Sequence, residues 1–290
     1  MHTMLRRSVI AIAASGSLLA ACHSGTVPNQ VLTKPAPASA PAASARASGV
    51  WAYQSPMQRQ GFVMDLRAVI TIRADTVTRT DTVSSHAELS FSVVPSTRGI
   101  NGSVNAFVVE GGGRPGATPA GLAIPFPVRA DYSARSAQLD FTAPHDDAPC
   151  GSIALAAAQS LRDLWFRPPD TLRVGTTWED SSAYVVCRDG IPLRTTARRS
   201  FRISGASEQN GRVLLSISRA TRMTLEGAGT QFGEAVSVSG TGNGQLVYDL
   251  DPISGEIIFA HGNSTLDLSL RSRLRTQSVR QLAEMRIGRS

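Results

Sequence analysis

The chain has 290 residues and a formal net charge of +7, from 29 basic and 22 acidic side chains. Lys34 is its only lysine, so almost all of the positive charge is carried by arginine. Without a motif that reads nucleic acid, this basic balance does not predict nucleic-acid binding. Composition alone therefore indicates neither a substrate nor a partner.

The first residues have the organisation of a removable export signal. A basic start at Arg6 and Arg7 precedes a short apolar run from Val9 to Leu19. Small polar residues interrupt the run, which is too short to span a bilayer core of ~30 Å as a stable helix. It ends in Leu19-Ala20-Ala21-Cys22, and this string resembles the lipobox of bacterial lipoproteins.

The resemblance implies that residues 1–21 form a signal peptide and that Cys22 is lipidated and becomes the first mature residue. Several acyl chains would then anchor the protein to a membrane. His23 follows the cysteine, where an Asp would direct retention at the inner membrane. The resemblance therefore implies an outer-membrane lipoprotein that faces the periplasm. The alternative is an ordinary secretory signal that happens to end in a cysteine.

The segment 22–50 follows the signal and is mostly Pro, Ala, Ser and Thr, with Lys34 and Arg46 as its charges. It has no hydrophobic periodicity and little apolar surface to bury. Such a composition predicts a disordered or partly polyproline-like tether between the lipid anchor and a folded domain.

Residues 51–290 are long enough for one sizeable core, and we expect a single β-rich domain. Period-two alternation predicts half-buried antiparallel strands, first from Phe62 to Val69 and from Thr76 to Val83 around a turn at Asp75. The clearest hairpin joins 245–250 to 256–261 across Asp251-Pro252-Ile253-Ser254-Gly255. Further candidate strands are 86–94, 103–109, 137–142, 182–186, 194–203, 213–219 and 234–239. The predicted fold class is mainly β, a curved antiparallel sheet or half-barrel.

One stretch, 152–166, departs from the alternation and has high helix propensity. Ser152 can cap its start, and Pro168-Pro169 would end it. We expect one short helix here that covers the concave face of the sheet.

Cys150 and Cys187 remain besides the lipidated cysteine. An even count in an oxidising compartment favours a disulfide between them, which would join the helix to the sheet. A catalytic thiol is the alternative, but no His lies in a recognisable Cys/His motif.

No motif supports an enzyme or a bound cofactor. The group His145-Asp146-Asp147 matches no standard metal site, and we interpret it as a solvated loop. Glu179 and Asp180 are interpreted as a solvated turn rather than an acid/base pair. The glycine strings at 111–113, 227–229 and 240–244 lack the helix and Lys of a phosphate-binding loop, so we interpret them as turns, bulges or loops between strands.

Arg271, Arg273 and Arg275 are predicted to line one face of one strand. Their guanidinium groups could contact the phosphates of anionic lipid, because arginine donates bidentately to phosphate. The alternative, which we favour, is a solvated strand face that also discourages edge pairing.

Three aromatic residues, Trp165, Phe166 and Trp178, are candidates either for the core or for the wall of a ligand groove. The segment 164–178 contains all three and resembles a pattern of uncharacterised β-rich bacterial lipoproteins, in which a Pro-rich turn is followed by a strand and a Gly-x-x-Trp motif. At the level of architecture, a tethered curved sheet is similar to carriers of the LolA, LolB and LppX type, and no ligand-binding residues are carried over.

The resulting expectation is a non-enzymatic envelope lipoprotein that binds a lipid or other apolar ligand on its concave face. The alternative is a structural or interaction lipoprotein that docks onto envelope proteins and has a filled core.

Overall fold

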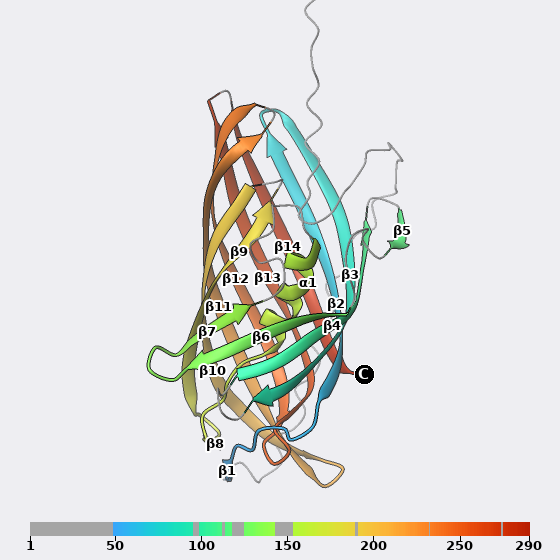
Figure 1. Ribbon diagram of the computed structural model, residues 1–290, viewed down its shortest axis with the longest axis vertical. Coiled ribbons are helices and arrows are strands. Elements are labelled where there is room, and N and C mark those ends of the chain that lie inside the picture. Colours follow the sequence, from blue (N-terminus) through green and yellow to red (C-terminus); the bar gives the residue numbers. More distant parts are fainter. Residues whose placement is uncertain are drawn as a thin grey trace, which may run out of the picture.

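The computed structural model describes residues 49–94, 99–111, 114–117, 125–142, 153–188, 191–231, 233–273 and 275–290 (Figure 1). These residues form one helix and a series of mostly long strands. In chain order the elements are β1 (Val50–Ala52), β2 (Gln60–Ala74), β3 (Val77–Val94), β4 (Gly99–Gly111), β5 (Arg114–Ala117), β6 (Phe126–Ser133), β7 (Gln138–Thr142), α1 (Ile153–Leu164), β8 (Thr171–Arg173), β9 (Thr177–Arg188), β10 (Ile191–Gln209), β11 (Arg212–Gln231), β12 (Glu234–Asp251), β13 (Glu256–Ser272) and β14 (Thr276–Arg289).

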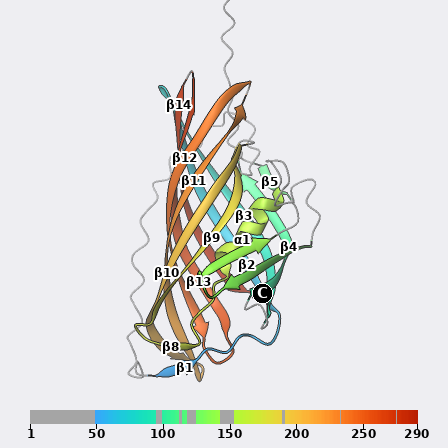
Figure 2. The same ribbon diagram turned by 60° about the vertical axis from the view of Figure 1, so that its left-hand side comes forward.

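Twelve of the strands form one strongly curved sheet in the order β3-β2-β14-β13-β12-β11-β10-β9-β7-β6-β4-β5. β3 also pairs with β4, so the sheet returns on itself and eleven of its strands make a ring, with β5 outside it. The pairings are antiparallel except for β7 and β9, which run parallel and share only two residue pairs. The remaining strands, β1 and β8, form a small separate sheet below the ring (Figures 1 and 2).

Alternation along each strand decides which side chains enter the ring. On β10, the residues from Ile191 to Ile203 are alternately buried and exposed. The exposed positions include Arg194, Arg198 and Arg202, whereas Leu193 and Phe201 are buried. Because side chains of successive strand residues point to opposite faces, the ring has an apolar inner face and a polar outer face.

The helix α1 lies against the concave inner face, as the sequence predicts (Figures 1 and 2). Its side chains Leu161 and Leu164 are fully buried in the core that the inward-facing strand residues form. Gly102 on β4 faces Leu161, and a Cβ atom at Gly102 would lie 3.0 Å from a Leu161 methyl group. The helix therefore needs a small residue on the neighbouring strand to approach the wall.

Two hydrophobic clusters divide the interior. The first surrounds the end of α1 and contains large aromatic side chains, among them Phe62, Phe166, Phe201 and Tyr248. The second lies further along the strands and contains only aliphatic residues, among them Leu225 and Leu268. We call the regions around these clusters the packed half and the cavity half.

The wall of the ring is hydrogen-bonded less completely in the cavity half. The pairing of β4 with β6 covers Ile100–Val104, whose buried residues belong to the packed half, and that of β7 with β9 covers only Ser181 and Ser182 on β9. Among the described residues, Ala183–Arg188 of β9 pair with β10 alone. In the described residues, strand pairing therefore closes the ring around the packed half and does not join β4 to β9 around the cavity half.

The fold class predicted from the sequence is confirmed, since the described part of the chain is mainly β with one short helix and a large curved sheet. The hairpin at 251–255 is also confirmed. Asp251 Oδ1 accepts hydrogen bonds from the N–H groups of Ile253 and Ser254, and Gly255 adopts a φ of 70°. The glycine residues of 240–244 do not form a loop, because they lie in the middle of β12. No helix in the described part of the chain is long and apolar enough to cross a membrane.

Candidate functional site

A cavity of about 310 Å³ lies inside the ring, between α1 and the cavity half of the wall. It is lined by side chains from α1, from β4 and from eight consecutive strands of the ring, β3-β2-β14-β13-β12-β11-β10-β9. Most of its wall is aliphatic. The residues that make this wall include Ile70, Val83, Leu193, Leu225, Leu266 and Leu268.

One of the inward-facing glycines on β12, Gly244, helps to leave this space open. Gly240, Gly242 and Gly244 occupy the same phase of the strand as the buried Val238 and Leu246. At Gly240 and Gly242 an added Cβ atom would come within 3.0 Å of neighbouring atoms, so the adjacent strands pack closely there. At Gly244, which lines the cavity, a Cβ atom would make only ordinary contacts at 3.4–3.8 Å. Gly244 therefore keeps a cavity position unfilled that a larger side chain could occupy.

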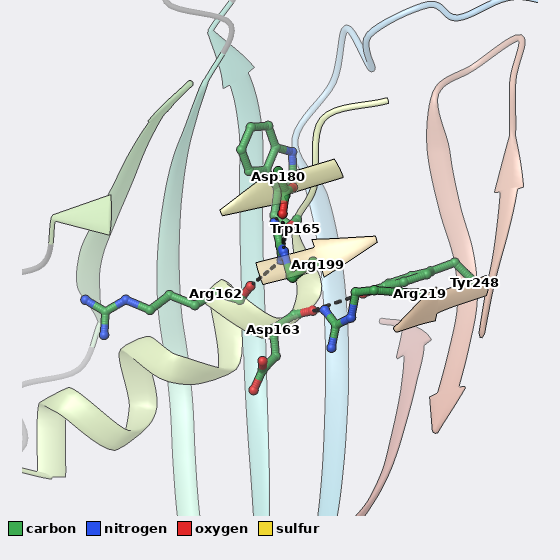
Figure 3. Close-up of polar contacts among 7 residues, drawn as sticks. All are labelled: Arg162, Asp163, Trp165, Asp180, Arg199, Arg219 and Tyr248. Atoms are coloured by element: carbon green, nitrogen blue, oxygen red, sulfur yellow. Dashed lines mark hydrogen bonds and ion pairs between the residues drawn. The ribbon is translucent and has the colours of Figure 1, made fainter. Parts of the chain in front are cut away.

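Polar side chains from α1 and β11, among them Asp163 and Arg219, form the floor of the cavity. Figure 3 shows the polar contacts of these two residues at the end of α1. Arg219 on β11 donates from Nη1 to the carbonyl oxygen of Asp163 at 2.6 Å, and the Tyr248 hydroxyl donates to the same oxygen at 3.1 Å. The last carbonyl groups of a helix have no partner within the helix and carry partial negative charge, so a buried cation satisfies them well. The two strands thereby hold the helix end in a fixed position.

A buried ion pair supports the helix end from a second direction (Figure 3). Arg199 donates from Nε and Nη2 to the two carboxylate oxygens of Asp180 at 2.6 and 2.7 Å, and from Nη1 to the carbonyl oxygens of Arg162 and Trp165. Burial alone lowers the pKa of Arg199, but the charge and hydrogen bonds of Asp180 outweigh it and the net pKa is raised. Arg199 therefore stays charged inside the ring.

The interpretation of Glu179 and Asp180 as a solvated turn is wrong. Both residues lie in β9, where Glu179 faces outward and is exposed while Asp180 faces inward and is buried. Asp180 is the partner of Arg199 rather than part of a carboxylate pair.

Burial also affects the tyrosines near the floor. It raises the pKa of Tyr248 and of Tyr184 to about 12, since a buried phenolate is poorly solvated. Tyr184 accepts a hydrogen bond from Gln159 Nε2 at 3.3 Å. Both hydroxyl groups are therefore neutral at physiological pH and act as hydrogen-bonding groups, not as bases.

Trp165, Phe166 and Trp178 belong to the packed half and do not line the cavity. Phe166 contacts the rings of Trp178, Phe201 and Tyr248 at centroid distances of 6.1, 5.1 and 4.7 Å. Trp178 stacks on Phe201 at 4.9 Å. Of the two roles weighed for these aromatics, the structure places them in the core.

Arg271, Arg273 and Arg275 do not share one face of one strand. β13 ends at Ser272, whose backbone N–H donates to the carbonyl oxygen of Arg275 in a tight turn, and β14 begins at Thr276. Arg271 and Arg273 are exposed and Arg275 is half-buried. The strand ends where the spacing predicted that it would continue, so the three residues surround a turn at the end of the ring. They do not contribute to the cavity.

Several candidate residues lie outside the described part of the chain: Cys22, Cys150, the side chain of Cys187 and the group 145–147. The lipidation and disulfide predictions remain predictions for that reason. Among the described residues, no group of three or more His, Cys, Asp or Glu side chains is arranged to hold a metal ion. No protein-family model matches the chain, and no curated protein matches it.

Sequence reasoning missed the polar floor, although a signal for it was present. Arg199 has the same strand phase as Ala197 and Phe201, and Arg219 has the same phase as Ile217. A charged residue in the apolar phase of a strand must be paired or hydrogen-bonded inside, because burying an isolated charge is unfavourable. Those two arginines could have been identified as interior residues.

Proposed function

We propose that this protein binds an apolar or amphipathic small molecule, such as a single-chain lipid, inside the ring of strands. The observation that supports this proposal is the cavity of about 310 Å³ with its mainly aliphatic wall. Small-molecule sites are mostly apolar cavities of about 300–1,000 Å³ with a few placed polar groups. The ring has both an aliphatic wall and a polar floor of this kind.

An empty space of this size would be unfavourable for the fold. At about 24 cal/mol per Å³ of enclosed cavity, a space of 310 Å³ that held neither water nor ligand would cost about 7 kcal/mol. That is comparable with the whole stability of a typical domain. An occupant that fills the space removes this cost, whereas a purely structural domain would gain from larger side chains at positions such as Gly244.

The site of action is part of the proposal. The lipobox at Cys22 supports an anchor on the outer membrane, with the ring in the periplasm. The described part of the chain begins at Gly49 and enters β1, close to the packed half, where Gln54 N–H donates to the carbonyl oxygen of Pro252. A tether leaving from this end would keep the cavity half clear of the anchor.

Native mass spectrometry with lipid extraction, applied to the full chain carrying Cys22→Ser, tests the proposal. The substitution prevents acylation, so any lipid found is a ligand and not the anchor. We expect a co-purified lipid of defined stoichiometry. The matched variants are Gly244→Leu, which fills the cavity, and Gln245→Leu, which adds the same side chain on the outer face.

Gly244→Leu is expected to lose the lipid and Gln245→Leu to retain it. A bare mass for the protein without these substitutions, together with unchanged stability of Gly244→Leu, would show that the cavity has no apolar occupant. The protein would then be better described as a structural or interaction lipoprotein.

A further inference from the structure

The floor of the cavity contains three buried polar atoms that have no hydrogen-bond partner among the described residues. They are Arg219 Nε, Thr221 Oγ1 and Gln159 Oε1. Arg219 and Thr221 are only 6% and 7% exposed. Buried polar groups are almost always satisfied, and a cluster of exceptions calls for an explanation.

The three side chains meet for reasons of local geometry. Arg219 and Thr221 are two residues apart on β11, so both point into the ring. Gln159 lies four residues before Asp163 on α1, so both are on one face of the helix. All four residues line the same cavity. The strand and the helix thereby direct a cation, a hydroxyl and an amide at one place.

Arg219 differs from Arg199 in its electrostatic environment. Arg199 has a carboxylate partner in Asp180 with two short hydrogen bonds. Arg219 donates to a carbonyl oxygen and lies 5.7 Å from the ring centroid of Tyr248, and no carboxylate among the described residues lies within 4.0 Å of its guanidinium group. Two similarly buried arginines are thus held differently, and only Arg199 has its charge balanced by direct contact.

The opposite end of the cavity has a different character. Leu225 and Leu268, together with Ile70 and Val83, belong to the wholly aliphatic cluster. A molecule that fills the whole cavity must therefore have one end that carries hydrogen-bond acceptors and another that is hydrocarbon. Negative charge on the first end would balance the Arg219 charge, because a guanidinium group binds oxyanions with directed N–H groups.

We propose that the occupant is a long-chain carboxylate, whose headgroup contacts Arg219 and Thr221 and whose chain lies along the aliphatic wall. This inference rests on the proposed function, since it assigns the chemical class of the ligand for the same cavity. Gln159 joins the headgroup site by turning its amide. The Tyr184 hydroxyl can then donate to Oε1, and Nε2 is free to donate to the ligand.

Asp163 is the charged group that opposes this assignment. Its carboxylate also lines the cavity, so it repels an anionic headgroup. Removing that charge without changing the shape, as in Asp163→Asn, should strengthen the binding of a carboxylate. The Arg219 and Asp163 variants therefore have opposite expected effects, which a loss of structure could not produce.

The test compares two ligands that differ only in the headgroup. Dodecanoate and dodecan-1-ol displace the neutral fluorophore N-phenyl-1-naphthylamine from the full chain carrying Cys22→Ser at pH 7.4. The quantity measured is the ratio of their affinities within each variant, because damage to the fold or to the aliphatic wall weakens both ligands and cancels in the ratio.

We expect the protein to bind dodecanoate about 10-fold to 100-fold more tightly than dodecan-1-ol, as a charge-assisted hydrogen bond predicts. Arg219→Met should reduce the ratio to about 1, and Arg219→Lys should retain part of it. Thr221→Val should lower the ratio severalfold, and Asp163→Asn should raise it.

Two outcomes would overturn the assignment, and they are distinguishable. If both ligands bind with a ratio near 1, or if Arg219→Met leaves the ratio unchanged, the cavity binds apolar molecules without a carboxylate site. If neither ligand binds and the fluorophore signal is the same for Gly244→Leu, then the proposed function itself is wrong.

Discussion

The packed half and the cavity half of the ring share most of their strands, and they differ in the size of the side chains that point inward. Around the end of α1 the interior is filled by aromatic rings, including Phe166, Phe201 and Tyr248, and the largest fully buried side chain is Tyr248. The other cluster consists of Ile, Leu and Val residues, and inward glycines on β12 lie next to it. The strand pattern is the same in both halves.

This difference shows what hydrophobic alternation does and does not determine. Alternation decides which face of a strand is buried, because side chains point to opposite faces with a period of two. The summed volume of the inward side chains decides whether the buried space is filled. In this ring the interior is filled where the inward residues are aromatic and is left hollow where they are aliphatic or glycine.

The buried pair of Asp180 and Arg199 supports the end of α1, and its loss should have the largest effect. Asp180→Asn leaves a buried guanidinium charge without its counterion, and we expect the free energy of unfolding to fall by about 3–5 kcal/mol. The control is Asp65→Asn, which breaks the exposed pair with His86 on the outer face and should cost less than about 1 kcal/mol. Urea denaturation measures both, and equal losses would contradict the assignment of Asp180 to the interior.

A matched pair of leucine truncations compares the two halves directly. Leu164→Ala, in the packed half, removes a fully buried side chain and should cost about 3 kcal/mol or more. Leu266→Ala, on the cavity wall, removes a side chain that already faces open space on one side and should cost about 1 kcal/mol. Thermal and urea unfolding of ligand-free protein provide the comparison. Equal costs would mean that the cavity is filled by packing.

Alkaline pH tests whether the two halves exclude water equally. The pKa of both Tyr248 and Tyr184 is about 12 in the folded protein and about 10 in the unfolded chain. The contribution of the two neutral phenols to the free energy of unfolding is therefore complete below pH 10 and is lost as the pH rises through 12. For Tyr248, which is fully buried, the loss at pH 11 is about 1.4 kcal/mol. Phenolate absorbance of Tyr248→Phe and Tyr184→Phe assigns each step. Ionisation of Tyr184 near pH 10 would show that water fills the cavity half.

A substitution on the outer face of the ring should have the smallest effect on the free energy of unfolding. Burial raises the pKa of Asp249, and the charge of His261 opposes this shift. Because the pKa of Asp249 is higher in the folded protein, ionisation of this carboxyl group disfavours the fold. The free energy of unfolding therefore falls as the pH rises from below about 4, the pKa in the unfolded chain, through the raised pKa of the folded protein. Asp249→Asn should therefore stabilise the protein at pH 7 by a few tenths of a kcal/mol. A clear destabilisation in urea would place Asp249 in a polar network instead.

Sequence reasoning identified the local structure where local signals are strong. The turn at Asp75 is confirmed by a φ of 52° at this residue, and the helix predicted at 152–166 is observed at Ile153–Leu164. The closure of the ring could not be predicted, because the strands that pair, such as β2 with β14, are far apart in sequence. The glycines of β12 were misread because only the neighbouring strands show why a side chain is absent there.

The number of strands has a consequence for the helix. In any closed circuit of strands the direction must return to its starting sense, so the number of antiparallel steps must be even. A ring of eleven strands therefore requires a parallel step, which in the described ring is β7 with β9. Parallel neighbours need a long crossover connection, usually one that contains a helix, and residues 143–176 between these strands include α1. The odd strand count thus makes a crossover obligatory, and in this protein the crossover carries the helix that lies inside the ring and contributes to the floor of the cavity.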